Sequence, residues 1–91
     1  MHKYTTQPSV ADTAPTENRV TDYDRTHLTN YLRLLDAAEE AAPWAEVARI
    51  VLGIDPTREP DRAKKVYDSH LARARWMSDQ GYRDVLRGAA H

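Results

Sequence analysis

Apolar side chains recur at three- and four-residue spacings over most of the chain from Thr21 onward. This repeat places them along one stripe of an α-helix. No segment alternates convincingly between apolar and polar residues, as a half-buried strand does. The sequence therefore predicts an all-α fold without an extensive sheet.

The first two predicted helices have clear signals at their ends. The first is expected from about Arg25 to Ala41, after acidic residues that suit the positive end of a helix dipole. Pro43 suits the first turn of the second helix, where a missing N–H costs little. Gly53 suits the left-handed position just past its end. Ala48, a small residue in that helix, is expected to let the third helix approach closely.

A long turn separates the second helix from the third. The stretch "IDPTREPD" holds two prolines and cannot continue a helix. The third helix is expected from Pro60 to about Gln80, and "YRDVLR" can add a short fourth. Two helices joined by a turn, the second with a free outer side, are the parts of a DNA-binding helix-turn-helix. We predict a small helical domain over residues 21–88, a helix-turn-helix variant with an extended turn. An unrelated helical bundle is the alternative.

The first twenty residues differ in composition from the rest. "MHKYTTQPSVADTAPTENRV" is rich in Thr, Pro, Ser and Asn and has few large apolar side chains. Such a segment buries too little surface to offset the entropy of ordering it. We therefore predict a disordered, flexible N-terminal tail over residues 1–20. The alternative is a segment that becomes ordered on a partner.

Several function classes find no support in the composition. The chain has 91 residues, which fits one small domain, and it has no cysteine. No apolar run is long enough to span a membrane, and the N-terminus does not resemble a secretory signal, so we expect a cytoplasmic protein. The glycines are too scattered for a phosphate-binding loop, and no nucleophile motif is present. We expect no enzyme activity, no catalytic residues and no cofactor. No metal site is expected either, because ligand spacing is absent among the histidines, which are His2, His27, His70 and His91.

The charge balance is unusual for a DNA-binding domain. The chain has 13 Lys and Arg against 14 Asp and Glu, a net charge of -1. DNA affinity comes largely from neutralising phosphates with basic side chains, and acidic residues oppose it. Weak or absent DNA binding is therefore the prediction. If DNA is bound after all, the third helix and the preceding turn supply the expected contacts, which are Arg58, Arg62, Lys65 and Arg73.

The ordered part of the sequence resembles the RovC-like DNA-binding domain family. The resemblance covers about residues 23–87, and its most specific pieces are "EVARIVLGIDP" and "HLARARWMSDQGYRDVL". It implies a helix-turn-helix variant with a lengthened turn. It also implies larger relatives that activate conjugative-transfer genes of mobile elements, with another domain ahead of this one. A stand-alone domain of this size is similar to the QseM-type antiactivators, which block such an activator by binding it.

These observations favour an antiactivator that mimics the activator's own helical domain and binds the activator through its N-terminal domain. We expect a monomer when free, with no membrane contact. The predicted partner surface is a second apolar line on the first helix, extended by the fourth. It comprises Tyr31, Leu34, Ala38, Tyr82 and Leu86. The alternative function is a small DNA-binding helix-turn-helix regulator of transcription.

Overall fold

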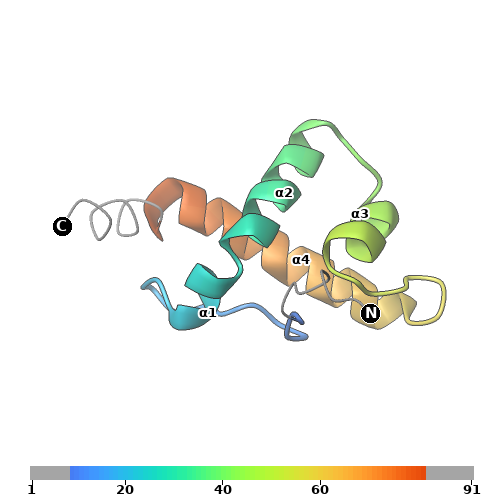
Figure 1. Cartoon of the computed structure of the whole chain (residues 1–91), viewed down its shortest axis with the longest axis horizontal. Coiled ribbons are helices and arrows are strands. Elements are labelled where there is room, and N and C mark those ends of the chain that lie inside the picture. Colours follow the sequence, from blue (N-terminus) through green and yellow to red (C-terminus); the bar gives the residue numbers. More distant parts are fainter. Residues whose placement is uncertain (1–8, 82–91) are drawn as a thin grey trace, which may run out of the picture.

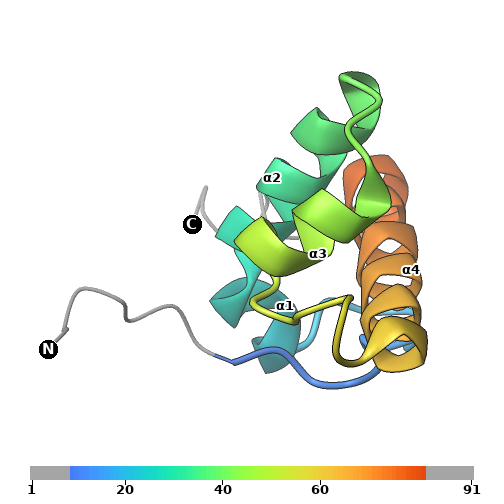
Figure 2. The same cartoon turned by 90° about the vertical axis from the view of Figure 1, so that its right-hand side faces the viewer.

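The longest helix, α4 (Pro60–Trp76), is the element around which the others pack. A computed structural model describes residues 9–81 of the chain. In this range the ordered elements are helices and no strand occurs, which confirms the predicted all-α class. Helices α2 (Leu28–Glu39) and α3 (Trp44–Val51) lie on one side of α4 (Figures 1 and 2). The short α1 (Asp22–Thr26) lies beside α4 below them.

Small side chains allow the close approach of α3 to α4. Ala48 on α3 and Ala63 on α4 are both fully buried, as is Ala74 near the end of α4. Leu34 from α2 and Val66 from α4 complete this part of the core. The close-packing role predicted for Ala48 thus agrees with its burial.

The helix predicted from Arg25 to Ala41 is divided in two. A break at His27 (φ -108°, ψ 23°) separates α1 from α2. Thr21 caps α1: its hydroxyl accepts the backbone N–H of Asp24, and the Asp24 carboxylate accepts the N–H of Thr21. This reciprocal capping fixes a separate helix start. At the other end, α2 stops at Glu39, and Ala41 adopts a left-handed conformation with φ 57°.

The end of α3 follows the prediction for Gly53, which has φ 72°. The N–H of Ile54 donates to the carbonyl of Ala48 over 3.1 Å, a closing bond typical of helix ends with a left-handed residue. Ile54 itself is buried. The turn then continues to Glu59, and Pro60 occupies the first turn of α4. Assignment of α3, this turn and α4 as a helix-turn-helix variant stays a prediction.

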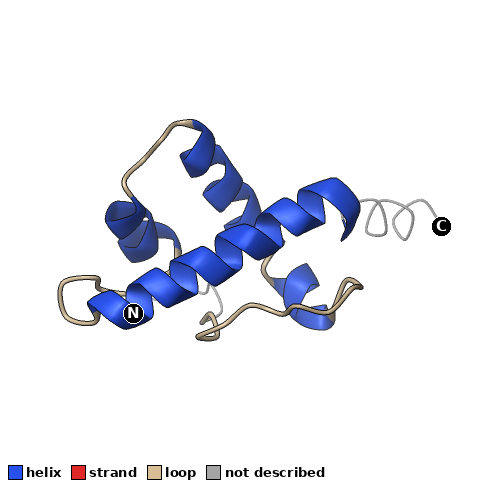
Figure 3. Cartoon of the chain, turned by 180° about the vertical axis from the view of Figure 1, so that it is seen from behind, coloured by secondary structure: helices blue, strands red, loops and turns tan. Residues whose placement is uncertain are grey.

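Residues 9–20 form an extended segment, called here the N-terminal strap, that runs beside α4 to the start of α1 (Figure 3). Ala14 and Val20 are buried. The N–H of Ala14 donates to Ser69 Oγ over 3.1 Å, and Asp12 pairs with Arg62 at 2.8 Å. The prediction of a flexible tail is therefore wrong for residues 9–20. Two buried side chains and several long-range bonds supply the attachment that composition alone did not reveal.

Beyond α4 the helix widens into one turn of π-helix, η1 (Met77–Gly81). The predicted fourth helix begins at Tyr82 and lies outside the described residues. Within residues 9–81, no helix is both long and apolar enough to cross a membrane.

Candidate functional site

The exposed side of α4 is the surface that a helix-turn-helix would present to DNA. We call it the free stripe. Apart from Ala72, its side chains are charged and exposed. They are Asp61, Lys64, Lys65, Asp68 and Arg75, followed on η1 by Asp79. Three acidic and three basic groups thus share this stripe, and their charges largely cancel. A fourth basic group, the exposed Arg62, lies at its flank and is paired with Asp12 and Glu59.

One of the three basic groups on the free stripe is held in a local ion pair. Lys64 Nζ lies 3.1 Å from Asp68 Oδ1, one helical turn away. The same ammonium lies 5.2 Å from the ring centroid of Trp44 and 5.7 Å from that of Tyr67. A cation placed over aromatic rings and beside a carboxylate has less to gain from a phosphate.

The four basic residues predicted to face DNA do not form one surface. Arg58 and Lys65 are exposed, as expected, and form no ion pair among the described residues. Arg62 is exposed too, but it pairs with Asp12 of the strap at 2.8 Å and with Glu59 at 3.0 Å.

The fourth of these residues, Arg73, is buried, and its prediction as a DNA contact is wrong. Its side chain is only 3% exposed. Its Nε and Nη2 donate to the two oxygens of Asp24 over 3.0 and 2.7 Å. Nη1 and Nη2 also donate to the carbonyls of Glu17 and Arg19 in the strap. The guanidinium therefore holds α4, α1 and the strap together.

The Asp24 carboxylate stays ionised in this buried position. Burial alone raises its pKa, but hydrogen bonds from Arg73, Thr21 and Tyr31 outweigh that effect and lower the pKa to about 2. The Tyr31 hydroxyl donates to Asp24 Oδ1 over 2.8 Å. Arg73, which was predicted to lie at the surface, is therefore a buried partner of Asp24 and is not available to bind phosphate.

A second buried network lies beside the first and contains His70. Its Nδ1 lies 2.8 Å from the carbonyl oxygen of Val66, which can only accept, so Nδ1 carries the proton. Its Nε2 then accepts from the Tyr23 hydroxyl over 2.6 Å. That hydroxyl accepts the backbone N–H of Ala11 in the strap over 2.9 Å. Burial lowers the pKa of His70, which favours this neutral form.

The predicted partner surface is wrong in its choice of helix face. Tyr31 and Leu34 are only 2% and 1% exposed and belong to the core. Ala38 is partly buried and packs against that core. Tyr82 and Leu86 lie outside the described residues. The other apolar line of the same helix, Leu28, Leu32 and Leu35, is the more exposed one.

An apolar groove lies where this line meets the C-terminal half of α4. Its volume is about 260 Å³. Leu32 at its edge is 58% exposed. The groove is lined by Leu28, Tyr31, Leu32, Leu35, Ala74, Met77 and Ser78. We call it the leucine groove.

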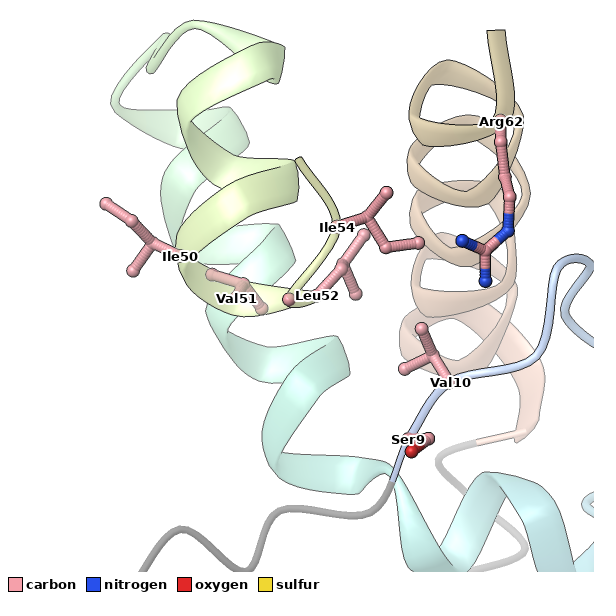
Figure 4. Close-up of a pocket in the computed structure, with 8 residues that line it drawn as sticks. Ser9, Val10, Ile50, Val51, Leu52, Ile54 and Arg62 are labelled. Carbon is pink, nitrogen blue, oxygen red and sulfur yellow. The ribbon is translucent and has the colours of Figure 1, made fainter. Parts of the chain in front are cut away.

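A second hollow of about 340 Å³ lies at the end of α3, beside the strap (Figure 4). Leu52 and Ile54 point toward α4, whereas Ile50 points away from it. Ile50 is 67% exposed. Arg62 and Val10 line the other side, so this hollow has a more polar wall than the leucine groove.

Metal coordination finds no candidate in the described part of the chain. Among residues 9–81, His, Asp and Glu side chains form no group of three that could hold a metal ion. The buried His70 is engaged at both ring nitrogens.

These features define a small domain that is all-helical over the described residues 9–81. A sequence profile described as "T6SS, Transcription factor, DNA binding domain" matches residues 2–87. The chain therefore belongs to this family, the RovC-type DNA-binding domains, and is a transcription-regulator domain. No curated protein matches the chain.

Proposed function

We propose that this chain is an antiactivator, which regulates transcription by binding a transcriptional activator rather than a promoter. The observation that carries the proposal is the free stripe of α4. It has equal numbers of acidic and basic groups, and Lys64 is already paired with Asp68. A domain that has the fold of a DNA-binding domain, but lacks an excess of basic side chains to bind phosphate, is suited to compete with the corresponding domain of an activator.

The proposed mechanism is mimicry of a domain of the same family. An activator that contains this domain packs it against its other domain, or against a second copy. A free domain with the same packing surface competes for that contact. Because the free stripe binds phosphate weakly, the complex of this chain with the activator does not bind DNA tightly enough to activate transcription. This mechanism requires an activator with a domain of the same family in the same cell.

The second candidate is a small DNA-binding regulator of transcription. Two observations favour it: the family is described as a DNA-binding domain, and Arg58 and Lys65 are exposed near the start of α4. A local basic patch can bind DNA despite a net negative chain, particularly at low salt. The two functions differ in which macromolecule the chain must touch.

A reporter assay separates these candidates. A promoter driven by an activator of this family is measured with and without co-expression of the chain. The chain's binding to the activator's N-terminal domain is measured with purified proteins. The proposal expects reduced activation together with a direct complex. Unchanged activation with no complex would overturn it, as would repression of the promoter in cells that lack the activator.

A further inference from the structure

We infer that the leucine groove docks an amphipathic helix of the protein partner, one whose apolar side chains are flanked by Lys or Arg. The inference rests on the proposed function, because it names the surface that would bind the activator. The shape and the charge of the leucine groove support it.

The groove has the dimensions that a helix needs. Leu28, Leu32 and Leu35 follow one another at spacings of four and three residues, so they lie along one side of α2. Seven residues of helix rise about 10 Å, which is about two turns of a docked helix. Ala74 and Met77 form the opposite wall. Small and unbranched side chains at that wall suit the entry of leucine-sized anchors.

Exposure of Leu32 requires an explanation within the fold. The core has room for Tyr31 and Leu34, which are almost fully buried on the adjacent side of α2. Leu32 instead extends into solvent at the edge of the groove, with 58% of its surface exposed. An apolar side chain at the edge of an apolar hollow is typical of a binding site, because both are covered together on docking.

Charge at one end of the groove selects the partner. A neighbouring hollow of about 330 Å³ shares Leu35 and Ser78 with the leucine groove. It is lined by Asp36 and Glu39 against one basic residue, Arg75. None of these three charges is ion-paired within residues 9–81. A Lys or Arg next to the apolar anchors of a docked helix therefore meets two available carboxylates.

The hollow at Ile50 is the weaker candidate for the same role. Its Arg62 is already paired with Asp12 and Glu59. Part of its wall is Ser9 and Val10 of the strap, which carry no charge to select a partner. Ile50 lines this hollow and is exposed (Figure 4), but among the described residues the hollow offers no unpaired charge that could select a partner.

The test uses the full chain, labelled with ¹⁵N, and two synthetic helical peptides of about 18 residues. Both peptides carry leucines on one face. One has lysines beside the leucines, and the matched peptide has glutamates in their place. We expect the lysine peptide to shift amide resonances of α2 and of Ala74 and Met77. It should bind about tenfold more tightly than the glutamate peptide at low salt, which corresponds to about 1.4 kcal/mol.

Two exposed leucine-sized residues give matched variants. Leu32→Asp should lower the affinity for the lysine peptide by at least about tenfold. Ile50→Asp, at a similarly exposed site, should leave that affinity unchanged. Both variants should have the circular dichroism spectrum of the unmodified chain. Asp36→Lys with Glu39→Lys should reverse the preference between the peptides.

Three results would overturn the inference. The first is no binding, or resonance shifts centred on Ile50. The second is a fall in molar mass of the peptide-free chain on Leu32→Asp, which would mean that a second copy occupies the groove. The third is a shift of the resonances of residues 82–91 on Leu32→Asp, which would mean that the chain's own end occupies it. Peptide binding without inhibition of an activator would contradict the proposed function and leave the groove assignment intact.

Discussion

The guanidinium of Arg73 contacts both carboxylate oxygens of Asp24, with Nε 3.0 Å from Oδ1 and Nη2 2.7 Å from Oδ2. Both side chains are almost completely buried. The same guanidinium also binds two carbonyl groups of the strap. The Arg73 side chain thus joins α4 to α1 and the strap, which lie 49 to 56 residues earlier in the sequence.

Loss of one member of this pair should be costly. Arg73→Met leaves the Asp24 carboxylate buried without its counter-ion, so we expect the free energy of unfolding to fall by about 3–5 kcal/mol. Urea unfolding followed by circular dichroism measures this. Arg25→Ala is the matched control, since Arg25 forms an exposed pair with Asp22 at 3.1 Å. Exposed pairs contribute about 0.2–1 kcal/mol. Equal effects of the two substitutions would show that Arg73 is not buried as described.

Stability should also fall in mild acid. Burial lowers the pKa of both His27 and His70 below the ordinary value of 6.5. Below pH 6.5 the unfolded chain therefore binds more protons at these two sites than the folded chain does, and protonation favours unfolding. We expect the melting temperature to decrease as the pH falls from about 7 to about 5.

The histidines can be followed individually in that pH range. Nuclear magnetic resonance titration of the ring protons should place both pKa values below 6.5. His70→Gln should flatten the dependence of melting temperature on pH. A pKa for His70 at or above 6.5 would contradict the neutral, doubly bonded ring.

The elements of the fold were largely predictable from sequence, because they depend on local signals. Helical periodicity, Gly53 and Pro60 placed α3, its end and the start of α4 correctly. The break at His27 was missed because no glycine or proline marks it, and Leu28 continues the helical pattern directly after it. The strap was missed for a different reason. Its attachment depends on bonds to Arg62, Ser69 and Arg73, which are more than forty residues away.

The functional surfaces were harder to predict than the helices. Two apolar lines on α2 have equivalent periodicity, and sequence alone does not say which one faces the core. The Tyr31 hydroxyl decides it, because Asp24 accepts its hydrogen bond in the interior. Likewise, Arg73 has the spacing of a core position on α4, but its charge suggested the surface. A basic residue at a core position of a helix is a signal that predicts a buried acidic side chain beside it.

The strap should open without unfolding the helices. Ser69→Ala removes the acceptor for the N–H of Ala14, which lies 3.1 Å from Ser69 Oγ. We expect faster hydrogen exchange at Ala14 and Ala11, with helical circular dichroism unchanged. Ser78→Ala, at an exposed position on η1, is the control and should change neither amide. If the Ala14 amide of the unmodified protein exchanges as fast as in an unstructured peptide, the strap is not attached to α4 as described.

Two residues with positive φ should respond in opposite directions to substitution. Gly53 has φ 72°, and beyond the glycine itself and its two chain neighbours no atom lies within 4 Å of the position that a Cβ would occupy there. Strain alone should therefore make Gly53→Ala destabilising, by about 1 kcal/mol. Ala41 has φ 57° and already carries that strain. Ala41→Gly should therefore raise the melting temperature. A decrease on Ala41→Gly would mean that this turn does not have the left-handed conformation.

The most direct test of the central claim, that this domain acts by binding protein rather than DNA, is fluorescence anisotropy of the full chain with duplex DNA. At about 0.1 M salt we predict only weak, non-specific binding, with a dissociation constant no tighter than about 10 µM. The variant Asp61→Lys with Asp68→Lys makes the free stripe basic and should bind more tightly, with a steeper dependence on salt. A sequence-specific complex of the unmodified chain at nanomolar concentration would contradict the account.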